Sequence, residues 1–472
     1  MFQNNKLQFS FSAYFAGMPI IFLISLFFYF ITNDLQHLML GFLIVYVITV
    51  FHTIRNYGLL SLYAIYLYTS AFFIYDCFIY TLFGGKDFLL QTFPYHFTIN
   101  EYSGFIFINC CFLSVYITHC AYNFLPKYKW LEKESKFPIK ENKSIEQIGL
   151  VLMIVFLIPV LYKIWIQLSF IKLHGYEAIF NGSIKKIQYP LWTSGSFIFF
   201  IGGYSLFFAA KPKKNKFLLA SLLFLLVYGC DSLKGQRGPI ISALLVVLYL
   251  FSRQYKVRIR FRHLVIFLFI IISIVILLDT IRNGYGAKSK VKNTTPIVKI
   301  VNEIIYGQTT SRAVPLVIIE KELKFHPYPF VFSPFFAPIY DVIYPSEGQD
   351  TVSAEHHNNI SGVTMYNLSP STYLKGGGLG GAFLGEAYDC GGFFGIIFWS
   401  IVISFVFVLF DYGLGCVRHK FRPLLFYFLL TIPVLPRSRI FGVVYDLNKI
   451  LFVYFILLLL SVRRYIKIRN YR

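Results

Sequence analysis

The sequence predicts an all-α, polytopic membrane protein with about twelve transmembrane helices. Of its 472 residues, 57% are hydrophobic and only 14% are charged, and the mean hydropathy is +0.62. Water-soluble domains do not have this balance. Apolar runs, such as 11–31 and 148–173, also recur along the whole chain. Each is long enough to cross most or all of a hydrocarbon layer about 30 Å thick, which excludes a single water-soluble domain.

The first apolar run follows only about ten residues and has no small-residue cleavage site after it, so we expect it to be retained as the first helix. The expected spans are residues 11–31, 35–51, 58–83, 102–125, 148–172, 190–210, 217–230, 240–251, 264–281, 381–411, 424–436 and 447–462.

Basic residues are distributed unevenly between the connections. The segments 126–147, 211–216, 252–263, 412–423 and the tail from 463 together hold 23 lysines and arginines, whereas the short connections of the opposite face hold seven. Lysine and arginine accumulate on the cytoplasmic side of membrane proteins. The net charge of +22 therefore indicates orientation, with both termini cytoplasmic, rather than nucleic-acid binding.

One connection is much longer than the others. Residues 282–380 are polar and rich in Gly, Pro, Tyr and Phe, and the span count places them on the outer face. Connections this long usually have a function. We therefore divide the chain into helices 1–9 (1–281), a large periplasmic loop (282–380), and helices 10–12 with a basic cytoplasmic tail (381–472).

The stretch DSLKGQRGP at 231–239 places two cations on the outer face, against the orientation rule. The guanidinium of Arg237 matches phosphate oxygens and Lys234 adds a point charge, so the stretch is a candidate site for an anionic headgroup. The alternative is a solvated turn in which Lys234 and Arg237 reach lipid headgroups and Asp231 is a local partner.

Further cations are predicted on the same face. Arg437 and Arg439 follow Pro436, where a helix should end, and Arg282 and Arg312 lie in the first third of the long connection. Together they would suit a diphosphate held without a dedicated metal site. Binding of ordinary anionic lipid is the alternative.

The stretch KGGGLGGAFLGEAYDCGGFFG at 375–395 contains nine glycines and enters the expected span 381–411. Glycine permits close backbone packing or unwinding beside a substrate chain. Glu386 would lie about one turn inside that apolar helix. A carboxyl group there should have a raised pKa, which suits a general base, or a cationic partner, which would make it a structural ion pair.

No cofactor or metal site is expected. The adjacent His356 and His357 have no suitably spaced third ligand, so we interpret them as part of a solvated loop. The seven cysteines lie mostly in or beside apolar segments and contain no CxxC pair, which is typical of small core residues. Nucleotide-binding loops, HExxH and GxSxG are absent from the sequence, which removes the parts needed for ATP-driven transport and the common soluble hydrolase mechanisms.

Three stretches together resemble a known family. They are GQRGPIISALLVVLYLF at 235–251, YGQTTSRAVPLVIIEKELKFHPYPFVFSPFFAPIY at 306–340 and LGGAFLGEAYDCGGFFGIIFW at 379–399. They resemble the Wzy-type O-antigen or oligosaccharide repeat-unit polymerases. The resemblance implies a GT-C-like membrane glycosyltransferase of the bacterial inner membrane with a periplasmic active face. It also implies that repeat units carried on undecaprenyl pyrophosphate are joined into O-antigen or a related surface polysaccharide.

The resemblance also implies site residues. The RG element of the family corresponds to Arg237 and Gly238, the loop element to Gln308 and Arg312, and the GEAY element to Gly385, Glu386 and Tyr388. Cys390 stands where a GEAYxNxG pattern would have asparagine. The predicted catalytic residues are therefore Glu386 and Arg237. The predicted binding residues for diphosphate or glycan are Lys234, Arg282, Gln308, Arg312, Tyr388, Arg437 and Arg439.

Two alternative functions would use the same lipid-linked substrate. A flippase for the lipid-linked unit would line a path open to both faces with charges, whereas the candidate charges here cluster on the outer face. An O-antigen ligase would share the fold and the lipid-diphosphate donor, and the sequence does not separate it from a polymerase. Expected partners are membrane lipids, a chain-length regulator and the flippase of the same pathway.

Overall fold

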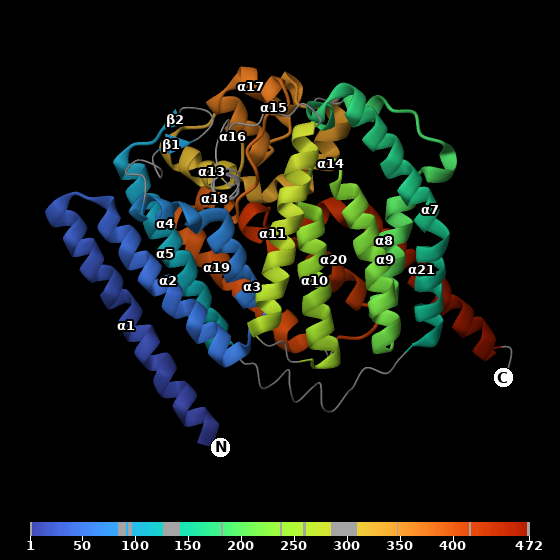
Figure 1. Ribbon diagram of the computed structural model, residues 1–472, viewed down its shortest axis with the longest axis horizontal. Coiled ribbons are helices and arrows are strands. Elements are labelled where there is room, and N and C mark those ends of the chain that lie inside the picture. The colour runs from blue at the N-terminus through green and yellow to red at the C-terminus, as the bar shows by residue number, and fades with distance from the viewer. Residues whose placement is uncertain are drawn as a thin grey trace. The chain divides into compact units, whose positions relative to one another are not determined.

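The computed structural model is almost entirely helical (Figure 1). It describes residues 2–83, 91–92, 97–125, 142–180, 183–236, 238–257, 261–284, 309–346, 348–414 and 417–469. The chain divides into two compact units. Unit 1 comprises residues 1–127, 290–409 and 435–440, and unit 2 comprises residues 128–289, 410–434 and 441–472.

Unit 1 contains the first five α-helices and a second group of helices from the late half of the chain. Its elements are α1 (Phe2–Thr32), α2 (Leu35–Tyr57), α3 (Leu62–Ser70), the π-helix η1 (Ala71–Tyr75), α4 (Asp76–Phe83), β1 (Gln91–Thr92), β2 (Phe97–Thr98), α5 (Glu101–Phe124), α13 (Thr309–Glu320), η5 (Phe330–Phe332), α14 (Ser333–Ile343), α15 (Thr351–His356), α16 (Ile360–Leu368), α17 (Pro370–Leu374), α18 (Phe383–Asp389) and α19 (Gly392–Val408).

The membrane part of unit 1 is built by α2 packing against α1 and α5, and by α19 packing against α5. Ser404 of α19 donates a hydrogen bond to the carbonyl oxygen of Thr118 at 3.0 Å, which ties the late helix to the early one. The two short strands pair antiparallel, Gln91 with Thr98.

From residue 309 onward, the expected loop 282–380 is folded into helices α13 to α17 (gold to orange in Figure 1). Ala313, Val314, Phe330, Ile360 and Tyr373 belong to one buried apolar cluster that joins α13, η5, α16 and α17. Helix α13 also packs against α18 and α5. This segment is therefore an integral part of unit 1, because it shares a hydrophobic core with the residues around it.

Unit 2 is a second set of packed helices in which α8 lies against α7, α20 and α21, and α9 lies against α10. Its elements are α7 (Lys143–His174), η2 (Tyr176–Ile179), η3 (Ser183–Lys186), η4 (Leu191–Thr193), α8 (Ser196–Ala209), α9 (Lys214–Ser232), α10 (Gly238–Tyr255), α11 (Phe261–Gly284), most of the π-helix η6 (Leu409–Gly413), α20 (Arg422–Thr431), the first half of η7 (Ile432–Arg437), η8 (Gly442–Asp446) and α21 (Leu447–Arg469).

Close helix packing in unit 2 depends on two glycines. A Cβ atom on Gly149 of α7 would lie 2.5 Å from the backbone nitrogen of Phe207, and one on Gly203 of α8 would lie 2.9 Å from the carbonyl oxygen of Gly149. The two backbones therefore touch where a side chain on either would separate them. Small residues at such positions are typical of helices that pack inside membranes.

Ten helices among the described residues are long and apolar enough to cross a membrane, and each lies at an expected position. The expected span 264–281 falls within α11, for which many side chains are not described. The chain is therefore a multi-pass membrane protein whose described elements are all helices apart from the short strands β1 and β2.

Two of the expected spans are wrong in detail. The span predicted at 424–436 is the ten-residue helix α20 followed by the 3₁₀ segment η7, because Pro433 and Pro436 lack the amide hydrogens that an α-helix needs. The span predicted at 381–411 is divided between α18 and α19, so the candidate span starts at Gly392.

Candidate functional site

Helix α18 contains the GEAY sequence and is separate from the membrane helix that follows it. It ends at Asp389, and α19 begins at Gly392, whose φ of 61° lies in the left-handed region that glycine tolerates. A Cβ atom on Gly395 would lie 2.0 Å from the carbonyl oxygen of Ala387, so the two helices cross in contact. The prediction that Glu386 lies inside a long membrane helix is therefore wrong.

Glu386 is fully buried in unit 1. Its Oε2 atom accepts a hydrogen bond from the backbone N–H of Ile440 at 2.7 Å. The other carboxyl oxygen, Oε1, has no hydrogen-bond partner among the described residues. Burial raises the pKa of Glu386 to about 7, and the Ile440 hydrogen bond and the positive charge of Arg439 oppose this shift. The carboxyl group therefore changes its protonation state near neutral pH.

The segment 435–440 places two arginines beside α18. A Cβ atom on Gly381 would lie 3.2 Å from the carbonyl carbon of Ser438, so this glycine allows the segment to pass close to the start of α18. Arg439 is half-buried and donates a hydrogen bond from Nη2 to Oδ1 of Asn359, and it interacts electrostatically with Glu386. Arg437 is exposed, with its guanidinium carbon 5.7 Å from the ring centre of Phe73.

A second carboxylate on α18 holds a histidine that the sequence did not single out. Asp389 Oδ1 lies 2.7 Å from His326 Nε2, and Asp389 Oδ2 accepts the backbone N–H of Phe330 at 2.7 Å. The Nδ1 atom of His326 lies 3.0 Å from Oδ1 of Asn358. Burial alone would lower the pKa of His326, but the hydrogen bonds to Asp389 and Asn358 outweigh burial and raise it.

Arg312 lies in a different environment from Arg437 and Arg439. It is 1% exposed, and Nη1 lies 3.5 Å from a carboxylate oxygen of Asp76. Asp76 follows the π-helix η1, an irregular turn of the kind often found at functional positions. Gly385 of α18 lies against the same helix as Arg312, since a Cβ atom there would be 3.5 Å from Cα of Pro315. Arg312 thus forms a buried ion pair in the core.

Unit 1 therefore brings a buried carboxyl group that titrates near pH 7 together with a half-buried arginine and an exposed one. This arrangement can accept a proton and hold an anion. The chain matches the family model described as O-antigen polysaccharide polymerase Wzy over residues 15–470, nearly its whole length. The chain belongs to this polymerase family.

No curated protein and no solved structure matches the chain. Membership of the O-antigen polymerase family establishes a role in polysaccharide polymerisation, with glycosyltransferase-like chemistry and a lipid-linked oligosaccharide substrate. The resemblance seen in three short stretches of the sequence is confirmed, because the match extends into both units and includes most or all of each candidate span.

In this polymerase, Lys234 has partners within unit 2. Its ammonium group lies 2.6 Å from Asp231 Oδ1 and donates to Gln167 Oε1 at 3.1 Å, and both charged side chains are 13% exposed. Gln167 in turn donates to the hydroxyl oxygen of Tyr189 at 3.1 Å. Asp231 is thus a local partner of Lys234, as in the alternative interpretation of 231–239, but the side chain of Lys234 is largely buried rather than solvated. Arg237 lies outside the described residues.

Of three other predicted site residues, the structure describes the side chain of only one. Arg282 lies in α11, but its side chain is not described, and Gln308 lies outside the described residues. Tyr388 is half-buried on α18, with its ring edge-on to Phe393 at 6.2 Å.

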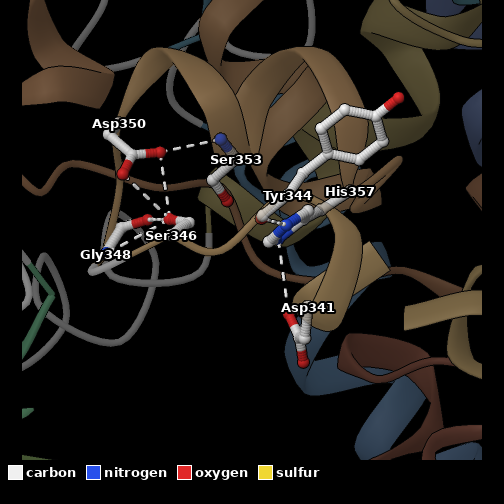
Figure 2. A network of polar contacts seen from close by, with 7 residues as sticks. All are labelled: Asp341, Tyr344, Ser346, Gly348, Asp350, Ser353 and His357. Carbon is white, nitrogen blue, oxygen red and sulfur yellow. Dashed lines mark hydrogen bonds and ion pairs between the residues drawn. The ribbon is translucent and has the colours of Figure 1, made fainter. Parts of the chain in front are cut away.

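His356 and His357 are not in a solvated loop, and that prediction is wrong. They end helix α15, where the ring of His356 stacks on Tyr344 at 4.0 Å. His357 lies 2.8 Å from the carbonyl oxygen of Tyr344 and 3.6 Å from Asp341 (Figure 2). Among the described residues no group of three His, Cys, Asp or Glu side chains could hold a metal ion. The histidines tie the end of α15 to α14.

Of the residues that the sequence analysis missed, only Asp389 has a local signal in the sequence. Asp389 follows Glu386 by three residues, so the two side chains lie on one face of a helix. Their partners, however, are 54 and 63 residues away along the chain. Asn358 adopts a φ of 42°, a left-handed conformation in which asparagine is enriched but which the sequence did not predict.

Proposed function

We propose that this polymerase joins oligosaccharide repeat units carried on undecaprenyl diphosphate at the periplasmic face of the bacterial inner membrane. The growing chain would be transferred from its lipid diphosphate to a hydroxyl group of the next lipid-linked unit. A glycosidic C–O bond forms while the bond from the anomeric carbon to phosphate breaks. The hydroxyl proton passes to a base, and the lipid diphosphate leaves with the bonding electrons.

One observation supports this proposal above the others: Glu386 has a pKa of about 7 and lies beside Arg439. A general base is most effective when its pKa is close to the operating pH. The oxygen Oε1, which has no partner among the described residues, is the atom that would accept the hydroxyl proton. Burial also keeps bulk water from the carboxyl group, which favours transfer to a sugar over hydrolysis.

Arg437 and Arg439 supply the second requirement, which is charge for the leaving group. Diphosphate departs as an anion, and guanidinium groups bind phosphate oxygens through paired N–H donors. Arg437 is exposed and Arg439 is half-buried, so both differ from the fully buried Arg312. We assign the diphosphate to Arg437 and Arg439. We leave Arg312 and Lys234 outside the site, because both side chains are largely buried against a carboxyl group of their own unit.

The roles of Arg237, Arg282, Gln308 and Tyr388 stay predictions from the resemblance. The same holds for the GT-C-like architecture, the cytoplasmic termini, and the partnership with a chain-length regulator and a flippase. The uneven distribution of lysine and arginine supports the orientation, because charged connections of this kind remain cytoplasmic. The orientation can be tested with single cysteines introduced at residues 135 and 375 and labelled with a membrane-impermeant reagent. In intact cells, only the cysteine at position 375 is expected to react.

The experiment that tests the function is complementation of a deletion strain with the full chain and with Glu386→Gln. The readout is the ladder of surface polysaccharide on a gel. We expect the deletion to leave a single repeat unit on the acceptor lipid, the wild type to restore long chains, and Glu386→Gln to resemble the deletion at equal protein level.

Other patterns would contradict the proposal. If no repeat unit reached the outer face in the deletion strain, the chain would act as the flippase. If long chains accumulated on the carrier lipid without reaching the acceptor lipid, it would act as a ligase. A normal ladder in Glu386→Gln would remove this residue from the chemistry while leaving the polymerase role intact.

A further inference from the structure

The dipeptide Asn358–Asn359 connects Arg439 to helix α18 through side chains on both sides of one peptide bond. Asn359 accepts a hydrogen bond from Nη2 of Arg439. Asn358, its neighbour, lies 3.0 Å from His326, which pairs with Asp389 at the end of α18. Neither asparagine was singled out by the sequence, and both lie in unit 1.

Asn358 is anchored firmly. It is fully buried, and its amide nitrogen donates to the carbonyl oxygen of Tyr328 at 2.8 Å. That donation assigns the amide orientation, so Oδ1 faces His326 and accepts the N–H of Nδ1. The other ring nitrogen, Nε2, faces a carboxylate oxygen of Asp389. When His326 is protonated, both of its nitrogens act as donors, and the raised pKa favours this form.

Helix α18 contributes to both ends of this arrangement. Glu386 accepts the backbone N–H of Ile440, which directly follows Arg439, whereas Asp389 holds His326 and thereby Asn358. The contacts form a closed circuit from α18 through Ile440, Arg439, Asn359, Asn358 and His326 back to α18. The backbone of Arg439 is fixed by one half of the circuit and its guanidinium group by the other.

Asn359 has two separable roles. Its Oδ1 atom accepts the backbone N–H of Ser361 at 3.1 Å, which caps the N-terminus of α16. The same oxygen accepts the hydrogen bond from Arg439. Since the acceptor is a neutral amide, the contact orients the guanidinium group without cancelling its positive charge. At the corresponding contact of Arg312 the partner is instead the acidic side chain of Asp76.

We propose that Asn359 is a positioning residue that orients Arg439 for an anionic phosphate group, with Asn358, His326 and Asp389 fixing Asn359 in place. The inference rests on the proposed function, because the anion is the diphosphate of the lipid-linked substrate. Asn359 does not take part in bond making. It reduces the orientational freedom that Arg439 would otherwise lose on binding the anion.

Two substitutions separate the roles of Asn359. In Asn359→Ser the short hydroxyl side chain still caps α16 but does not reach Arg439. In Asn359→Gln an amide oxygen is kept for Arg439, whereas glutamine is a poor N-cap. Loss of the cap should lower the melting temperature, and loss of the arginine contact should weaken substrate binding. Asp350→Ser, which exchanges one capping residue for another on α15, is the matched control.

The measurement uses the purified full-length chain in lipid vesicles, with lipid-linked repeat units as substrate and inorganic pyrophosphate as competitor. We expect Asn359→Ser to raise KM and the inhibition constant for pyrophosphate about tenfold, the effect of one hydrogen bond to a charged group, with kcat within about twofold. Asn359→Gln should keep KM close to the wild-type value and lower the melting temperature. Asp350→Ser should leave KM unchanged.

Two outcomes would overturn the inference. In the first, Asn359→Ser has an unchanged KM and an unchanged inhibition constant for pyrophosphate, whereas Arg439→Lys loses activity. The other is an equal rise of KM in Asn359→Ser and Asp350→Ser, which would indicate a general loosening of the helices. In both cases the polymerase function stands. Failure of the wild-type chain to extend lipid-linked units would instead contradict the proposed function itself.

Discussion

Arg312 and Arg439 have the same side chain and the same predicted role, but their surroundings in unit 1 differ. Arg312 is 1% exposed and faces the carboxylate of Asp76. Arg439 is half-buried, bonds to the neutral amide of Asn359, and lies near Glu386, which is only partly ionised at neutral pH. Arg312 is therefore paired with an acidic side chain inside the core, whereas the hydrogen bond that holds Arg439 is to a neutral amide. The partner of an arginine decides its role.

The largest effect is expected from Arg312→Met, which leaves Asp76 buried without its arginine. Removing one member of a buried ion pair costs about 3–5 kcal/mol. We expect loss of folded protein, measured as the melting temperature and the monodisperse yield of the purified chain. The double variant with Asp76→Leu should recover much of that stability, because it removes both charges together. A stable but inactive Arg312→Met would instead place this arginine in the site.

The next largest effect is expected from Arg439→Ala. The variant should lose long polysaccharide chains, with a rate reduction of at least about a hundredfold, because a charge that stabilises the leaving group is gone. Its melting temperature should change little. Arg439→Lys keeps the charge without the planar fork and should be intermediate. Arg55→Ala, at an exposed arginine of α2, is the control. Wild-type chain length in Arg439→Ala would contradict the assignment of Arg439 to the diphosphate.

Glu386 should make the activity depend on pH. Since its pKa is about 7, the rate should rise as pH increases through 7 and the base becomes ionised. Glu386→Gln should be slower and lose this part of the profile. The stability changes in the opposite direction: the folded state keeps the proton that the unfolded chain loses near pH 4.5, so the free energy of unfolding falls between about 4.5 and 7.

Glu386→Gln should abolish that dependence of stability on pH, because an amide does not titrate in this range. The amide oxygen can still accept the Ile440 hydrogen bond. Rates and melting temperatures measured from about pH 5 to 8.5 on the two proteins test both statements, since this range brackets the transition of the buried carboxyl group. An unchanged rate profile in the variant would mean that Glu386 only holds the segment 435–440.

The smallest effect is expected at the pair of His326 and Asp389. Because the pKa of His326 is raised in the fold, the stabilisation is complete below its ordinary value of about 6.5 and is lost as pH rises through the raised value. We expect a loss of about 1 kcal/mol, the usual size for one hydrogen-bonded pair. Asp389→Asn should remove this dependence.

Since Glu386 acts in the same direction, the melting temperatures should be compared in a Glu386→Gln background. The two chains to compare are the one that retains Asp389 and the one that also carries Asp389→Asn. An identical pH dependence of stability in these two chains would contradict the assignment to His326.

Much of the fold could be predicted because hydropathy is a local property of the chain. All ten candidate spans lie where apolar runs predicted them, since a membrane helix must bury about 20 apolar residues regardless of its neighbours. The prediction failed where local backbone chemistry interrupts an apolar run. Gly391 and Gly392 separate α18 from α19, and Pro433 ends the α-helical part of the run near 431.

The sequence alone determined that this chain is a multi-pass membrane protein of the O-antigen polymerase family, and it singled out Glu386 and the arginines. Only the tertiary structure decided which arginine faces a carboxylate and which faces an amide. Those choices depend on contacts between residues far apart in the chain, such as Asp76 with Arg312 and Asn359 with Arg439. Such contacts decide how each arginine can act, because the charge and burial of its partner change the electrostatic energy of the guanidinium group in a low-dielectric interior.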